Sequence, residues 1–183
     1  TMDNGGTANI NKVGIGVDAI SSGIVIPGSS AALVIDVASG ILAQTGIISG
    51  GVNATPVLDK TGDGLLVLSG ANTYLGTTTL NGGTTLLASP ANTSLALGAT
   101  GFGNDTVVNS GATLASGTIN NGASGGTFAD LLTINGEGFR NNGAIRGFMG
   151  INTTTFSGGL TFGSNTRIQN DQAGLLQFTG AVT

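Results

Sequence analysis

The apolar residues of the chain occur in short bursts, separated by clusters of glycine, asparagine, aspartate and serine. Each burst is about three to six residues long, as in segments 65–68, 77–80 and 84–87. Such bursts are typical of β-strands, and the clusters between them are typical of tight turns. No stretch of ten or more residues has the periodicity of an amphipathic helix. The pattern predicts an all-β fold with many turns.

These predicted strands are too short for a stable two-layer sandwich. They suit a coil in which each strand pairs with its equivalent one turn later, so we expect a right-handed parallel β-helix (β-solenoid) with Gly/Asn-rich corners. Rungs of about 20–25 residues would give about eight rungs in 183 residues. Val, Ile, Leu, Ala and Phe should point inward, and Thr and Ser outward. Segments 120–122 and 141–143, both Asn-Asn-Gly, are predicted corners.

The chain also repeats itself over a long interval. Residues 22–49 resemble residues 157–183 at an offset of about 135 residues, with one deletion. We therefore expect residues 1–183 to form a single solenoid segment that spans slightly more than one long unit. Because the chain begins and ends within the pattern, we also expect it to be a fragment of a longer repetitive protein.

Composition narrows the range of functions. Gly, Thr, Asn and Ser make up about half of the chain, whereas charged residues make up 8%. The net charge of −4 and the five scattered Lys and Arg residues argue against nucleic acid as a partner. No apolar run is long enough for a transmembrane helix. Without Cys or His, the chain has no disulfide, no Cys-ligated metal and no Ser-His-Asp triad.

Few residues are candidates for chemistry, and we assign no catalytic, cofactor-binding or metal-binding residue. Segment 59–64 faintly resembles a calcium loop, but we interpret it as a turn with positive φ at Asp63-Gly64. Segment 101–104 is likewise interpreted as a turn. Arg140 and Arg146, near Glu137, could form a surface ion pair or contact an acidic sugar, and pairing is favoured. The nine acidic residues contain no Asp-Asp or Asp-x-Asp cluster: Asp3, Asp18, Asp36, Asp59, Asp63, Asp105, Asp130, Glu137 and Asp171.

The aromatic residues are interpreted as structural. The single tyrosine, Tyr74, is expected to pack over a turn or into the coil and not to face a ligand. The phenylalanines are concentrated in the second half of the chain, and we expect them to stack inside the coil: Phe102, Phe128, Phe139, Phe148, Phe156, Phe162 and Phe178.

One segment carries a specific motif. Residues 62–86 resemble the passenger-associated repeat of bacterial autotransporters, with the pattern G-x-G-x-L-x-L-S-G-x-N-T-Y-x-G-x-T. The matching positions are Gly62, Gly64, Leu66, Leu68, Ser69, Gly70, Asn72, Thr73, Tyr74, Gly76, Thr78, Leu80, Gly83 and, one residue late, Leu86. The resemblance implies a secreted parallel β-helix that is located outside the cell, on the bacterial outer surface.

Two functions of different classes follow from these observations. The favoured one is a structural or adhesive, non-enzymatic segment of a surface fibre. Its expected partners are other solenoid units, in the same chain or joined head to tail, and host-cell or matrix glycans and proteins. The alternative is a β-helical carbohydrate-active enzyme or sugar-binding module, which requires that acidic residues on different rungs gather on one face.

Overall fold

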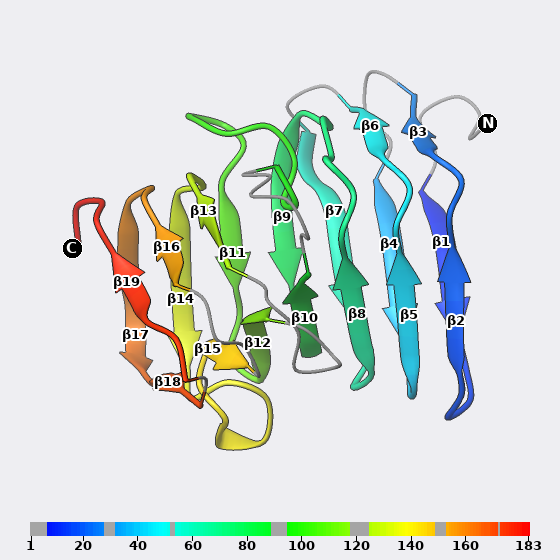
Figure 1. Ribbon diagram of the computed structural model, residues 1–183. Coiled ribbons are helices and arrows are strands. Elements are labelled where there is room, and N and C mark those ends of the chain that lie inside the picture. Colours follow the sequence, from blue (N-terminus) through cyan, green and yellow to red (C-terminus); the bar gives the residue numbers. More distant parts are fainter. Residues whose placement is uncertain are drawn as a thin grey trace.

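The computed structural model describes residues 7–27, 32–51, 54–88, 95–117, 125–148, 153–171 and 173–183, and of residues 54–56 the backbone alone. The chain winds into a β-solenoid in which all the strand pairs found are parallel, as the sequence predicts (Figure 1). In the described ranges, no helix has the length and apolar character needed to cross a membrane.

Three faces build the solenoid. The first face contains β1 (Ala8–Lys12), β4 (Leu33–Val37), β7 (Ala54–Thr61), β9 (Gly76–Leu80), β11 (Thr106–Val108), β14 (Leu132–Gly136) and β17 (Leu160–Thr166). The second face contains β2 (Val17–Ile20), β5 (Ile41–Gln44), β8 (Leu65–Leu68), β10 (Gly83–Leu87), β12 (Ala112–Gly117), β15 (Ile145–Phe148) and β18 (Ile168–Asn170). The third face contains two separate sheets, one of β3 (Ile24–Ile26) and β6 (Ile48–Gly50), the other of β13 (Gly126–Phe128), β16 (Thr154–Phe156) and β19 (Leu176–Phe178). A short 3-10 turn, η1 (Phe139–Asn141), lies in the connection from β14 to β15.

The rungs differ in length. Leu58 pairs with Thr78, 20 residues later, whereas Thr78 pairs with Thr106, 28 residues later. The first face contains seven strands, so six full turns separate β1 from β17. An isolated bridge between Leu160 and Val182 begins the next turn. This is slightly fewer than the eight rungs expected, because some corners use more residues than a tight turn requires.

Inward-facing positions form one continuous apolar core. In β4, for example, Leu33, Ile35 and Val37 are buried, while the residues between them are partly exposed. This alternation follows from the period of two along a strand. It confirms the expected division between apolar interior and polar exterior on the first face.

Only some of the phenylalanines form the expected stack. Phe128, Phe156 and Phe178 stack inside the third face, with successive ring centroids 5.6 and 5.5 Å apart. Phe162 faces inward beside Ile134 but is 43% exposed in the last rung. The prediction is wrong for three others, because they lie in turns or at outward positions: Phe102, which is 97% exposed, and Phe139 and Phe148, which line an external groove.

Glycine shapes the corners between the first and second faces. Gly40 has φ of 71°, and a Cβ there would collide with the backbone carbonyls of the preceding rung. In the 59–64 turn the positive φ belongs to Gly62 and not to Asp63-Gly64, which corrects the prediction. Segment 101–104 is a turn, as expected. Segment 141–143 is a corner, as expected, whereas segment 120–122 lies outside the described residues.

The long repeat of about 135 residues remains a prediction. In the structure, Ile24–Ile26 lies on the third face, and Leu160–Thr166, at the corresponding offset, lies on the first face.

Candidate functional site

Residues 71–75, within the motif segment, continue the third face between β6 and the following rung. The amides of Thr73 and Leu75 donate to the carbonyls of Ile48 and Gly50, both at 2.8 Å. The segment thus adds a strand-like edge where the chain passes from β8 to β9. Inward-facing side chains at this edge are Asn72 and Tyr74, and both are fully buried.

Asn72 joins three successive levels of the solenoid. Its Oδ1 accepts a hydrogen bond from the amide of Ile48 at 2.8 Å, and its Nδ2 donates to the carbonyl of Ala96 at 2.7 Å. An amide side chain supplies a donor and an acceptor at once, which neither a carboxylate nor a hydrocarbon can do. Asn72 therefore satisfies one buried backbone group in each neighbouring rung, the amide of Ile48 and the carbonyl of Ala96.

Tyr74 fills the interior beside this link, as expected for it. Its hydroxyl shares a hydrogen bond of 2.6 Å with Oγ1 of Thr78, and burial raises the pKa of the phenol. Gly98, with φ of 92°, lies against the ring so closely that any Cβ would collide with it. The residues Asn72, Tyr74 and Thr78 thus form a packed internal cluster that no ligand reaches.

Two aspartates from different rungs lie close enough to influence each other electrostatically, and the charge of one of them, Asp130, also acts on Tyr74. Asp105 precedes β11 and Asp130 precedes β14, 25 residues apart in the chain. Asp130 is 1% exposed, and neither of its carboxylate oxygens has a hydrogen-bond partner among the described residues. Burial, reinforced by the charge of Asp105, raises the pKa of Asp130 to about 8. Asp130 is therefore largely protonated at neutral pH.

Lys60 places a cation in the interior, which the sequence reasoning missed. It is fully buried on β7, and its Nζ donates to the corner carbonyls of Gly62 and Gly82 at 2.6 and 2.8 Å. Burial lowers the pKa of Lys60 to about 8, against the opposing pull of nearby Asp36 and Asp63. Lys12 makes a similar contact in the first rung, where its Nζ donates to the carbonyl of Gly14. The inward alternation along β7, which places Lys60 two residues after a buried leucine, was the available signal.

The outer surface of the first face carries a short ladder of polar side chains. Nδ2 of Asn109 donates to Oδ1 of Asn81, and Nδ2 of Asn81 donates to Oδ1 of Asp59, both at 2.6 Å. Side chains stacked on successive rungs thus bond along the solenoid axis. Asn81 and Asn109 directly follow the last residues of β9 and β11, so this ladder lies where the first face passes into the corner.

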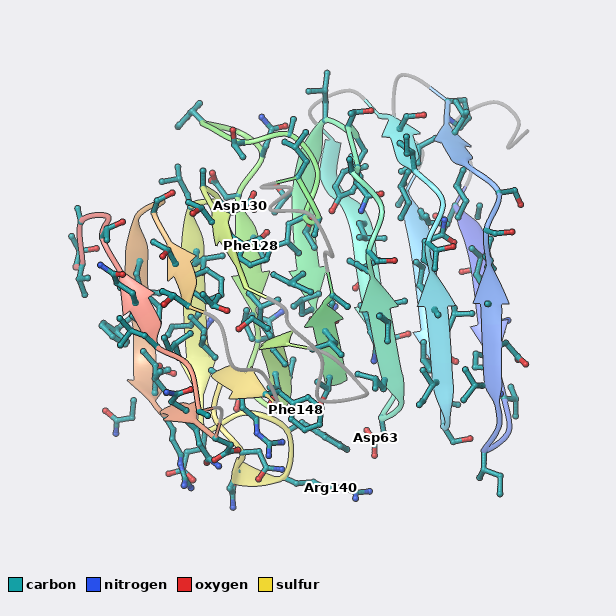
Figure 2. The ribbon with its side chains drawn as sticks, viewed as in Figure 1. Asp63, Phe128, Asp130, Arg140 and Phe148 are labelled. Atoms are coloured by element: carbon teal, nitrogen blue, oxygen red, sulfur yellow. The ribbon has the colours of Figure 1, made fainter. Side chains whose placement is uncertain are left out.

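An external groove of about 420 Å³ runs beside the second face. One wall comes from the corners around Ser39 and Asp63, and the other from the loop 137–144 together with β15. Arg140, Asn142, Phe139 and Phe148 line the second wall. Figure 2 shows Asp63, Arg140 and Phe148 gathered at the lower edge of the solenoid.

The arginine pairing was predicted with the wrong carboxylate. Nε of Arg146 lies 2.6 Å from Oδ2 of Asp171, and hydrogen bonds from Gln169 and Arg146 lower the pKa of Asp171. Arg140 stacks over the ring of Phe139 at 4.8 Å. Within the described residues, neither arginine forms an ion pair with Glu137. Glu137 is close to both arginines in the sequence, but the loop has no regular repeat that would place the three side chains on one face.

The acidic residues that the structure describes do not gather where a substrate could reach them. Asp105 and Asp130 approach each other in a corner beside the core, while Asp63 is the one acidic residue lining the groove among those the structure describes. Asp59 bonds to Asn81 on the first face, so the faint calcium loop is divided between two surfaces. Over the described ranges, no group of three or more metal-ligating side chains is present.

Comparison with known proteins identifies the motif segment. Residues 58–87 match the passenger-associated transport repeat family, and the matched range includes Asn72 and Tyr74. Together with the solenoid, this match fits an autotransporter passenger repeat. No curated protein and no solved structure matches the chain. Repeats of this family are generally structural and imply a surface or secreted protein.

Proposed function

We propose that the chain is a structural and adhesive segment of a bacterial surface fibre, located outside the cell. The observation that carries the proposal is the position of the passenger-associated repeat. Its Asn72 links three levels of the solenoid by side-chain hydrogen bonds, and its Tyr74 fills the core beside that link. The motif residues thus serve the building of a rod.

The physical basis of this role is the stepwise growth of a solenoid. Each rung pairs only with its neighbours, so folding can propagate from a formed rung to the next. Asn72 pre-positions a donor and an acceptor for both adjacent rungs. A chain that arrives at the cell surface segment by segment can fold on such a template. The repeat then supports export by making each added rung favourable.

The same geometry supports partners of the same kind. In the last rung, the inward-facing Phe162 is 43% exposed and Phe178 is partly exposed, whereas Phe156 one rung earlier is 2% exposed. A further solenoid unit placed on this end would cover apolar surface and pair the strand edges. We propose that such units, in the same chain or in another subunit, are partners of this segment.

The proposed role does not include catalysis. The carbohydrate-active alternative needs two carboxyl groups about 5–10 Å apart around a substrate. The described groove offers Asp63 alone; Asp130 is buried beside the core, and Asp105 is not among the residues that line the groove. Sugar binding without catalysis is compatible with the groove.

Electron microscopy of the purified chain tests the structural role. We expect rods whose diffraction shows a repeat of about 4.8 Å along the rod axis, the spacing of hydrogen-bonded strands. Asn72→Ala should shorten or abolish the rods, while the surface variant Thr79→Ala should leave them intact. Particles whose diffraction lacks this repeat would rule out the proposal, whereas compact particles about 30 Å long, the height of six turns, would rule out assembly between separate subunits. Labelling of intact bacteria that express the parent protein, with an antibody against this segment, tests its location.

A further inference from the structure

The loop 137–144 makes the external groove. It connects β14 to β15 and lies against the start of β12 in the preceding rung, where the amide of Phe139 donates to Oγ1 of Thr113 at 2.9 Å. The hydroxyl of Thr113 in turn donates to the carbonyl of Gly143 at 2.8 Å. The loop is thus held toward corners of earlier rungs, and the groove of about 420 Å³ lies between them. Its size is within the range of small-ligand sites, about 300–1,000 Å³.

The backbone at the lip of this groove is strained. Arg140 and Asn141 have φ of 54° and 60°, whereas every other described residue with positive φ is a glycine. A left-handed conformation costs a non-glycine residue about 1–2 kcal/mol. The chain uses glycine at such positions elsewhere, so the arginine side chain is retained at Arg140 against a local cost. Strain of this kind is concentrated at ligand-binding sites.

The donors of Arg140 are available to a ligand. Arg146, the other arginine of the groove, is engaged by Asp171, whereas the contact found for Arg140 is the ring of Phe139. Stacking on a ring fixes the plane of the guanidinium and leaves its N–H groups at the edge. A planar fork of donors fits a carboxylate in two-point contact.

The opposite wall offers complementary chemistry. Asp63 presents an acceptor-only carboxylate, and Ser39 and Thr84 present hydroxyl groups. Leu65 supplies apolar surface between the walls, and beside it lies Phe148, with the guanidinium of Arg146 over one face of its ring at 4.8 Å. A ligand that fits both walls carries a carboxylate for Arg140, hydroxyl donors for Asp63 and an apolar ring face. A carboxylated pyranose has all three.

We propose that this groove binds a carboxylated sugar residue, such as a hexuronic acid of a polysaccharide. The carboxylate lies on Arg140, ring hydroxyls donate to Asp63, and the apolar face of the ring lies on Leu65, next to Phe148. This inference rests on the proposed adhesive function and gives it a site and a ligand class. The rod-forming role does not depend on it.

Titration calorimetry with trigalacturonic acid tests the proposal, with its methyl ester as the uncharged match. We expect the wild type to bind the acid and to bind the ester at least about tenfold more weakly, since a charge-assisted contact is worth about 1.5–3 kcal/mol. Sialyllactose serves as a second probe, because sialic acid shares the same chemistry. Binding of either acidic sugar supports the site, and the tighter one identifies the source. If neither binds, the proposal is wrong.

Two variants separate a built site from general charge attraction. Arg140→Gln should weaken binding at least about tenfold. Asp63→Asn should also weaken binding, because it removes the carboxylate that accepts from the ring hydroxyls. Removing a negative charge would instead strengthen a general attraction to an acidic sugar, so tighter binding would overturn the proposal. Glu137→Gln is the matched control, because it removes the same charge from the exposed start of the loop, outside the groove lining, and should change nothing.

Stability provides an independent readout. Arg140→Gly relieves the positive φ, so its melting temperature should equal or exceed that of the wild type while sugar binding is lost. A lower melting temperature would assign Arg140 a structural role and contradict the proposal. If the variants that lose sugar binding still form rods, the sugar site and the fibre role are independent, and each can be tested without the other.

Discussion

Replacing Asp130 by asparagine should abolish most of the acid-side pH dependence of the protein's stability. The carboxyl group is 1% exposed and has its pKa raised from 3.8 to about 8. In the unfolded chain the group ionises near pH 4, whereas the folded protein keeps the proton until about pH 8. Between these values the folded state binds more protons, so the free energy of unfolding falls as pH rises.

The size of the effect follows from the shift. Each pKa unit corresponds to 1.36 kcal/mol, so a shift of about four units makes the wild type roughly 5 kcal/mol less stable at pH 8 than at pH 4. Burial is the main cause of the raised pKa of Asp130, and the charge of Asp105 adds to it; the charge of Asp130 in turn raises the pKa of the Tyr74 phenol. An amide of the same shape cannot ionise, so Asp130→Asn should lose this decline.

Urea unfolding followed by circular dichroism at pH 4 to 8 measures the decline directly. We expect a falling free energy of unfolding in the wild type and a nearly flat profile in Asp130→Asn. Asp105→Asn is the control, because removing the neighbouring charge should shift the decline to lower pH without abolishing it. A flat wild-type profile, or a decline that survives in Asp130→Asn, would refute the assignment of a buried proton to Asp130.

Three further predictions concern the core. Lys60, with a pKa of about 8 in place of 10.5, should make stability rise by roughly 3 kcal/mol from pH 8 to 10.5, and Lys60→Met should remove that rise in urea titrations. Asn72→Ala leaves two buried backbone groups unpaired and should lower the free energy of unfolding by about 2–5 kcal/mol. Phe156→Ala should cost about 3–5 kcal/mol in the same assay, whereas the exposed Phe102→Ala should cost less than about 0.5 kcal/mol; equal losses would contradict the observed stack.

The pH predictions combine into one curve. Asp130 makes stability fall up to about pH 8, and Lys60 makes it rise beyond that value. The wild type should therefore have a minimum of stability near pH 8. The double variant of both positions should show neither slope.

Much of the candidate site was outside the reach of sequence reasoning. The motif residues Asn72 and Tyr74 could be singled out, because a known repeat pattern contains them. The contacts of these residues could not be predicted, since Asn72 bonds to Ile48 and Ala96, each 24 residues away. The groove depends on a loop that crosses another rung, and the pattern of Asn141-Asn142-Gly143 indicates only that a corner exists.

The sequence alone determined the class of the fold and the direction of most side chains. Short apolar bursts with glycine at the corners indicate a parallel solenoid, and a period of two places alternate residues inside and outside within each strand. The repeat motif identified the segment that joins successive rungs. These features are local, so a linear reading is enough to find them.

The tertiary structure decided which rungs lie in register. Paired residues on adjacent rungs are 19 to 31 residues apart, so no fixed period aligns the rungs, and the sequence does not show that Asp130 comes to lie near Asp105. Nor does it show that Phe128, Phe156 and Phe178 form one stack while Phe148 faces outward. The physical reason is that the length of each corner sets the alignment of the next rung, and corner length is governed by contacts between rungs.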